Sequence, residues 1–310
     1  MNSKARFAFI AVSILWGIPY LLIKIAVDDG VPPAFVAWAR VVLGAVILLA
    51  LSWKFGVVEA LRQRLKWLAA FAVLEIVIPF PLIASGERHV DSSVAAILIA
   101  AAPLFVALLA LRLDPTERVS GWRLVGLFIG FAGVVLLVGI DIAGRSSELY
   151  GVGAVLASAF CYAVGPMILK HHLSDLDPRV SMGACLGIAA ILLAPAAALD
   201  RPRTMPSNPA LLSLLGLGLL CTAMALALYG VLVREAGPAR ALVVTYINPV
   251  IAVIAGILVR GEHLGVSGMS GLGLILVGSW LSTESGQKQP GSESTDLRLP
   301  TDQATDSTDS

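Results

Sequence analysis

The sequence predicts an all-α integral membrane protein of ten transmembrane helices, built as two inverted five-helix repeats. Three observations predict this fold: an apolar composition, ten apolar runs of spanning length, and an internal duplication. Of the 310 residues, 57% are hydrophobic and 14% are charged, whereas soluble domains have roughly 45–50% and 25%. So few polar groups cannot cover a water-exposed globule, and the bilayer is therefore the expected solvent.

Ten apolar runs are separated by charged or Pro/Gly-rich clusters, and each is long enough to cross a hydrocarbon core, which takes about 20 residues. The first run continues past Trp16 and Lys24 without a small-residue cleavage site, so we interpret it as a retained helix. The expected spans are residues 7–27, 34–53, 67–86, 92–111, 120–140, 150–169, 181–199, 210–233, 239–258 and 266–282.

Basic residues are unevenly divided between the two sides of these spans. With the N-terminus inside, fifteen of the 22 Lys and Arg residues are cytoplasmic and five are on the opposite side, while Lys24 and Arg40 lie within spans. Lys and Arg accumulate in cytoplasmic loops. We therefore expect a multi-pass protein of the cytoplasmic (inner) membrane with both termini in the cytoplasm, which also requires an even number of spans.

The chain repeats itself at an offset of 145 to 146 residues. The fourth and fifth spans align with the ninth and tenth, and the first span aligns with the sixth. The matched pairs are Pro103 with Pro249, Glu117 with Glu262, Gly126 with Gly271, Gly133 with Gly278, Trp16 with Tyr162, Pro19 with Gly165, Tyr20 with Pro166 and Lys24 with Lys170.

The expected repeats cover residues 1–141 and 149–283. An odd number of helices in each half makes the second half enter the membrane from the opposite side. Inverted repeats are common in secondary transporters, in which two copies alternate around a midplane site. The 284–310 segment is polar and acidic, so we expect a disordered cytoplasmic tail.

Three segments resemble the EamA family of the drug/metabolite transporter superfamily. They are WGIPYLLIK (16–24), PLFVALLALRLDPTERVSGWRLVG (103–126) and NPVIAVIAGILVRGEHLGVSGMSG (248–271). The resemblance covers about residues 7–282 and implies ten helices around a central cavity and efflux or exchange of metabolites without ATP hydrolysis. The sequence differs from the family pattern at Asp114-Pro115-Thr116, in place of a Gly, and at His263, in place of Arg or Lys.

Two charged residues lie well inside predicted spans. Of 21 acidic residues, only Glu75 does so, and an ionisable group at that depth must face protein or water. Arg40 in the second span differs from it in depth by roughly 9 Å. The two side chains could form a pair that a substrate or proton competes for, or a purely structural ion pair, or they could extend separately towards water. Lys24, nearer the outer end, is expected to extend towards water, with lining of the cavity as the alternative.

Aromatic and amide side chains add polar edges at mid-depth, as a cavity for a small organic solute requires. Ordinary aromatic packing is the alternative. With the two charged residues, the substrate-binding candidates are Trp16, Tyr20, Arg40, Glu75, Tyr162, Tyr246 and Asn248.

Prolines and glycines interrupt several spans. Pro19, Pro103, Pro166 and Pro249 are candidate hinges or kinks around the cavity, or plain packing kinks. Gly126, Gly130 and Gly133, with Gly268, Gly271 and Gly278, allow close helix packing, within the chain or across a possible homodimer.

No enzyme or cofactor motif stands out. The net charge is only +1, and the basic residues are scattered among the loops, so we expect no nucleic-acid partner. His171 and His172 are adjacent and point apart, which argues against a metal site with Asp175 and Asp177. We expect no cofactor and no catalytic residue. The predicted function is a secondary transporter of small metabolites that exports amino acids or related solutes; the alternatives are an intramembrane enzyme and a non-catalytic sensor or scaffold.

The charge bias gives a direct test of topology. Single cysteines placed at 142–149 should react with a membrane-impermeant maleimide in intact cells, because this loop is expected outside. Cysteines placed at 171–179 should react only after permeabilisation. The reverse labelling pattern would contradict the assigned orientation.

Overall fold

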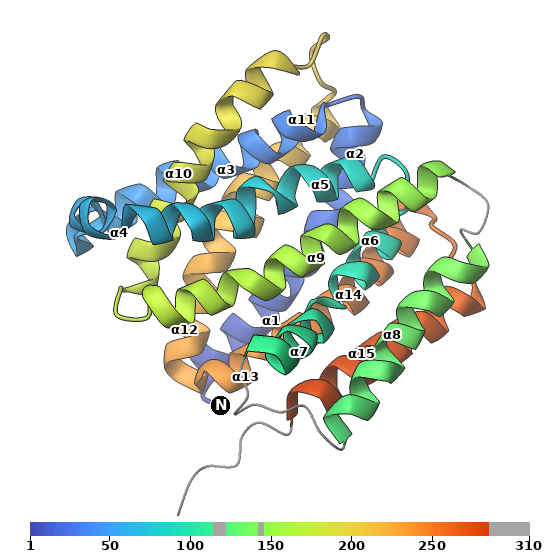
Figure 1. Ribbon diagram of the computed structural model, residues 1–310. Coiled ribbons are helices and arrows are strands. Elements are labelled where there is room, and N and C mark those ends of the chain that lie inside the picture. The colour runs from blue at the N-terminus through green and yellow to red at the C-terminus, as the bar shows by residue number, and fades with distance from the viewer. Residues whose placement is uncertain (114–121, 142–145, 285–310) are drawn as a thin grey trace, which may run out of the picture.

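The computed structural model describes residues 1–113, 122–141 and 146–284, and these ranges contain helices and connecting loops but no β-strand (Figure 1). The elements are α1 (Ser3–Gly17), α2 (Pro19–Asp28), α3 (Pro33–Ser52), the 3₁₀ turn η1 (Trp53–Phe55), α4 (Val57–Ala72), the π-helix η2 (Val73–Val77), α5 (Pro79–Gly86), α6 (Ser92–Ile99), α7 (Ala102–Leu113), α8 (Trp122–Asp141), α9 (Ser146–His172), α10 (Pro178–Leu199), α11 (Asn208–Leu215), the π-helix η3 (Gly216–Met224), α12 (Ala225–Ala236), α13 (Pro238–Leu242), α14 (Val244–Ala255), the π-helix η4 (Gly256–Arg260) and α15 (Val266–Glu284).

In the described ranges, eight helical stretches are long and apolar enough to cross a membrane. They are Ser3–Asp28, Pro33–Phe55, Val57–Gly86, Ser92–Leu109, Ser146–His172, Pro178–Leu199, Asn208–Ala236 and Arg240–Arg260. Two shorter apolar helices, Leu124–Val138 and Val266–Ser282, lie within α8 and α15. This inventory agrees with the predicted all-α integral membrane class.

The third helical stretch begins well before the predicted boundary at residue 67. Hydropathy excluded residues 57–66 because they contain Glu59 and several basic side chains. Val57 and Ala60 are nevertheless buried, which gives this segment one apolar face while its charges remain in water. Arg64 has non-helical dihedral angles and marks a kink. The charged segment is therefore an amphipathic extension of the helix rather than a loop.

The helices break at or near several prolines. The first stretch is interrupted at Ile18, and Pro19 begins α2, where a missing backbone N–H leaves no helical hydrogen bond unmade. Pro103 follows a break between α6 and α7. Pro166 lies within α9, and Pro249 within α14. Whether these positions act as hinges stays a prediction.

Several helix contacts made by the first half of the chain have a counterpart made by the second half. Helix α5 packs on α9, and α12 packs on α1. Likewise, α4 packs on α10, and η3 packs on α3. The remaining large contacts join α3 with α10 and α8 with α15, and Figure 1 shows α8 and α15 side by side at one edge of the bundle.

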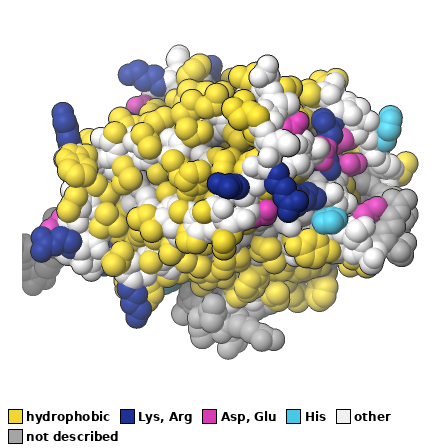
Figure 2. All heavy atoms as spheres, turned by 90° about the horizontal axis from the view of Figure 1, so that it is seen from above, with side chains coloured by type: hydrophobic (Ala, Val, Ile, Leu, Met, Phe, Trp, Pro, Cys, Tyr) yellow, Lys and Arg dark blue, Asp and Glu magenta, His cyan; other side chains and the backbone are white. Residues whose placement is uncertain are grey.

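The exterior is predominantly apolar between charged regions. Exposed side chains include Ile10, Val46, Phe128, Ile191 and Leu258. Figure 2 shows hydrophobic side chains over most of one face, with most of the visible acidic side chains and the visible histidines toward the right of the view. An apolar surface this extensive would aggregate in water. It is the surface expected of a protein embedded in lipid.

Glycines hold α8 against α15. A Cβ atom at Gly126 would lie 2.6 Å from the Leu281 Cβ, and one at Gly133 would lie 2.8 Å from the Leu274 Cβ. Gly278 lies directly against the Gly130 backbone. The glycine pattern therefore serves packing within the chain at these positions, as small residues commonly do in membranes. Gly268 differs, because it faces Leu264.

We predict that Gly278→Ala lowers the free energy of unfolding by about 1–3 kcal/mol, because the added methyl group would overlap a backbone that cannot rotate away. Gly273→Ala on the same helix is the matched control, since a Cβ there meets nothing within 4 Å. It should be neutral or slightly stabilising. Thermal unfolding in detergent measures both variants, and equal stabilities would contradict the packing argument.

Candidate functional site

Arg40 is held in the interior of the bundle by two neighbouring helices. It lies roughly 10 Å along α3 from Pro33, at ~1.5 Å per residue. Its Nε donates a hydrogen bond of 2.9 Å to the Thr222 Oγ1, and its guanidinium carbon lies 4.1 Å from the centre of the Phe80 ring. A cation over an aromatic face is attracted by the ring quadrupole. These contacts fix the position of the charge.

Close helix packing makes the contact with Thr222 possible. A Cβ at Gly44 would lie 2.7 Å from the Thr222 Cγ2, and a Cβ at Gly218 would lie 3.2 Å from the Arg40 carbonyl oxygen. Helix α3 therefore approaches η3 at two glycines. The Thr222 hydroxyl donates to the Leu217 carbonyl at 2.8 Å, which directs an oxygen lone pair to Arg40.

Two tyrosines from other helices lie within electrostatic range of Arg40. They are Tyr20 on α2 and Tyr162 on α9, and both pack against the same apolar cluster, which includes Ile83 and Leu217. The structure thus brings together three of the seven candidate residues. Their side chains combine a guanidinium with two phenols in a predominantly apolar setting.

Glu75 lies elsewhere and does not pair with Arg40. No hydrogen bond or ion pair joins the two in the part of the chain that the structure describes. The Glu75 carboxyl occupies the space beside Gly165 on α9, and its Oε2 is buried without a hydrogen-bond partner. The expected pair fails to form because η2 turns Glu75 towards α9, whereas Arg40 faces η3 and α5.

The other candidates are a second group around the contact of α1 with α14. Trp16 packs against Tyr229, with ring centres 4.8 Å apart. The Asn248 side-chain amide faces two carbonyl oxygens, so its nitrogen is assigned to that side. The nitrogen then donates to the Val244 oxygen at 2.9 Å and to the Ser13 oxygen at 3.2 Å. Tyr246 is half-buried on the same helix. Hydropathy and motif reading did not identify Thr222, Phe80 or Tyr229 as members of either group.

A charged pocket lies at the end of the bundle away from the N-terminus. Its volume is about 310 Å³, and it is lined by Lys24, Asp91, Arg260, Gly261, Glu262 and His263. None of the seven candidates lines it. The sequence signalled this pocket only through two family segments, the first of which ends at Lys24 and the second of which contains Glu262 and His263.

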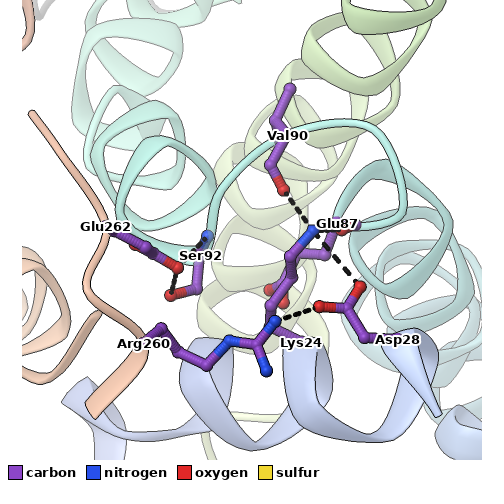
Figure 3. Close-up of polar contacts among 7 residues, drawn as sticks. All are labelled: Lys24, Asp28, Glu87, Val90, Ser92, Arg260 and Glu262. Carbon is purple, nitrogen blue, oxygen red and sulfur yellow. Dashed lines mark hydrogen bonds and ion pairs between the residues drawn. The ribbon is translucent and has the colours of Figure 1, made fainter. Parts of the chain in front are cut away.

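Ion pairs connect the elements around this pocket (Figure 3). The Lys24 Nζ donates to the Glu87 and Val90 carbonyl oxygens at 2.7 and 3.2 Å and lies 3.4 Å from an Asp28 carboxylate oxygen. Asp28 also pairs with Arg260. Lys24 was expected to extend into water. These acceptors instead hold its ammonium group against the protein, where it lines the pocket.

Glu262 caps the N-terminus of α6. Its carboxylate accepts backbone hydrogen bonds from Ser92 at 3.1 Å and Ser93 at 3.0 Å, and hydroxyl bonds from both serines. These groups are the unpaired donors of a helix start. Burial acts to raise the pKa of Glu262, but the four hydrogen bonds outweigh it and leave the pKa below its usual value. Glu117, the matched residue of the first repeat, lies outside the described residues.

The metal ligands considered from the sequence have other partners. His172 stacks on Trp67 with ring centres 3.4 Å apart, Asp175 pairs with Arg64, and Asp177 pairs with Arg179. No group of three potential metal ligands occurs among the residues that the structure describes.

Known proteins resemble this chain over most of its length. Residues 3–139 and 149–283 each match the EamA-like transporter family. An uncharacterized inner membrane transporter of Escherichia coli, YedA, is 29% identical, and the alignment covers 87% of this chain and 87% of YedA. Protein PagO of Salmonella typhimurium is 26% identical over 88% of this chain and 91% of its own. A solved crystal structure shares the fold, with a TM-score of 0.64 and 21% identity over 91% of this chain and 98% of its own.

The cap on α6 predicts a pH-dependent stability. Because the folded-state pKa of Glu262 is lowered, its contribution is present above the usual Glu pKa and is lost as the pH falls through the folded-state value. Glu262→Gln should therefore cost about 1–3 kcal/mol at pH 7 and almost nothing in acid. Thermal unfolding across pH measures this, with exposed Glu59→Gln as the control. A penalty independent of pH would contradict the charged cap.

Proposed function

Because the chain belongs to the EamA-like transporter family, we propose that it is a secondary transporter that exports amino acids or related small solutes across the cytoplasmic membrane. The relatives support the general role, since YedA and a protein of Archaeoglobus fulgidus are named as transporters. The solute class is our inference from the site, and the direction is our inference from the family resemblance.

The placement of Arg40 carries the proposal. In the described ranges, no carboxylate is within ion-pair distance of it, so its positive charge is only partly compensated by the Thr222 hydroxyl and the Phe80 ring. A guanidinium at this depth is costly unless it serves a site. Its planar donors match a carboxylate. A solute carboxylate would therefore complete the charge balance.

The tyrosines around Arg40 suit the rest of a small organic solute. Tyr20 and Tyr162 present phenol groups that donate or accept hydrogen bonds and aromatic faces that pack on carbon. Few polar groups on an apolar wall are typical of sites for small molecules. A second wall, nearer α14, would be formed by Trp16, Tyr246 and Asn248. The solute would enter or leave alongside this wall.

We propose ten spans in two inverted repeats as the transport architecture. The corresponding helix contacts support it, because exchanging the two halves converts the α5–α9 contact into the α12–α1 contact and leaves α8–α15 unchanged. The stretches Val57–Gly86 and Asn208–Ala236, each the third span of a proposed repeat, also contain a π-helix, η2 and η3 respectively. Two states related by such a repeat would open the Arg40 region alternately to each side.

Counterflow in liposomes tests this function directly. Purified protein should exchange radiolabelled amino acids faster than nucleosides or cationic drugs, because only the first class presents a carboxylate to Arg40. Failure to exchange any of the three classes would contradict the transport proposal.

Arg40→Gln should slow carboxylate exchange at least about tenfold, since removing one partner of a buried charged contact costs roughly 2–5 kcal/mol. Arg234→Gln removes the same charge from an exposed position on α12 and should leave exchange unchanged. Thermal unfolding of both variants separates loss of binding from loss of fold. Equal rates in the two variants would exclude Arg40 from the site.

A further inference from the structure

Glu87 has a buried carboxyl group with no hydrogen-bond partner. It immediately follows Gly86, the last residue of the third candidate span, and its exposed fraction is 0%. Neither carboxyl oxygen is hydrogen-bonded. Glu262, a short distance away in the same network, has four donors for its carboxylate. An ionised carboxylate without donors is far costlier to bury than a neutral carboxylic acid.

The charged groups around Glu87 are committed to other partners. The Lys24 Nζ binds the Glu87 backbone carbonyl and the Val90 carbonyl, and it pairs with Asp28. Figure 3 shows Lys24 and Asp28 rising from α2 towards the turn that contains Glu87 and Val90. The other titratable groups that act on Glu87 are Tyr20 on α2, Arg40 on α3 and Glu262 after η4.

These surroundings favour the neutral acid. Burial raises the pKa of Glu87 well above its usual range, Lys24 and Arg40 oppose the shift, and Glu262 and Asp28 add to it. Glu75 is half-buried, with one buried carboxyl oxygen, but no cation of the described residues acts on it comparably and it does not line the pocket. Among the residues that the structure describes, only Glu87 has both an unpartnered carboxyl and a neighbouring ammonium group, that of Lys24, which lines the pocket.

We propose that Glu87 is a proton-binding site, exchanging through the pocket beside Lys24, and that the bound proton is the ion coupled to transport. This inference rests on the proposed transport function. In the described conformation the carboxyl holds its proton. When the pocket opens to water, the Lys24 ammonium group exchanges the two carbonyl oxygens for the Glu87 carboxylate, while the proton passes to water.

The network provides the link between proton release and helix movement. Arg260 ends the stretch Arg240–Arg260 and contacts Asp28 on α2, and Glu262, two residues later, contacts the start of α6. Opening the pocket breaks contacts that converge on Lys24. Because the same movement frees Lys24 and exposes Glu87, the protonation state of Glu87 would bias the equilibrium between closed and open forms.

Infrared spectroscopy of the purified protein tests proton binding without any solute. The wild type should show a protonated carboxylic acid band at neutral pH that disappears on alkaline titration, and Glu87→Gln should remove the Glu87 component of this band. Glu75→Gln identifies the contribution of the half-buried acid, and exposed Glu59→Gln is a control. Persistence of the full band in the Glu87 variant would overturn the proposal.

Lys24→Gln gives a second test should Glu87→Gln fail to fold. Removing the ammonium group takes away an interaction that favours the ionised carboxylate, so the Glu87 band should titrate at higher pH. An unchanged titration would contradict the pairing of Lys24 with Glu87. Thermal stability offers a further measurement. Because the folded-state pKa of Glu87 is raised, the thermal stability of the wild type should fall as the pH rises through that pKa. Glu87→Gln should remove this pH-dependent part of the stability.

Coupling is measured in proteoliposomes with an amino acid that gives counterflow. A pH gradient should drive its accumulation by the wild type, whereas Glu87→Gln should abolish accumulation and retain exchange. Accumulation that survives in this variant would exclude Glu87 as the coupling residue. Absence of counterflow in the wild type would contradict the transport function, and the infrared result would still decide whether Glu87 binds a proton.

Discussion

The absence of water from the hydrocarbon core is the constraint on which the rest of this structure depends. Every backbone donor and acceptor there must be satisfied within the protein, so the described chain crosses as helices with an apolar exterior. The same constraint makes each interruption conspicuous. The π-helices η2 and η3 and the break at Pro19 face other helices, which supply the packing that an interruption in lipid would lack.

The same constraint sorts the buried charges into distinct types. Arg40 retains a charge that cannot be removed at physiological pH, and it is therefore held by a hydroxyl and an aromatic ring. Glu262 remains a carboxylate because four donors surround it. Glu87 lacks such donors among the described residues and is best accommodated as a neutral acid. A permanent cation suits a binding site, and an acid that can lose its proton suits coupling.

The two regions lie at different depths but are not independent. Tyr20 on α2 lies within electrostatic range of both Arg40 and Glu87, and Lys24 is one turn further along the same helix. A movement of α2 would therefore alter the solute region and the charged pocket together. Glycine contacts between α8 and α15 give the bundle a tightly packed edge against which such a movement could occur.

Composition and periodicity were sufficient to predict the membrane class and the approximate positions of the helices, because the cost of burying polar groups in lipid is read directly from residue type. Motif spacing was sufficient for the family, which the comparison confirmed. The start of the third helix at Val57 was missed because an amphipathic extension in water carries the same charges as a loop.

Side-chain partners could not be derived in this way. Depth placed Arg40 near Glu75, but depth contains no information about rotation around a helix axis, and the two residues face different neighbours. Glu87 was overlooked because it lies one residue beyond a span and reads as a loop residue. Glu87 is fully buried where its turn meets α2, with the Lys24 ammonium group bound to its backbone carbonyl. Only tertiary packing decides which of the polar groups near a helix end reach water and which are enclosed.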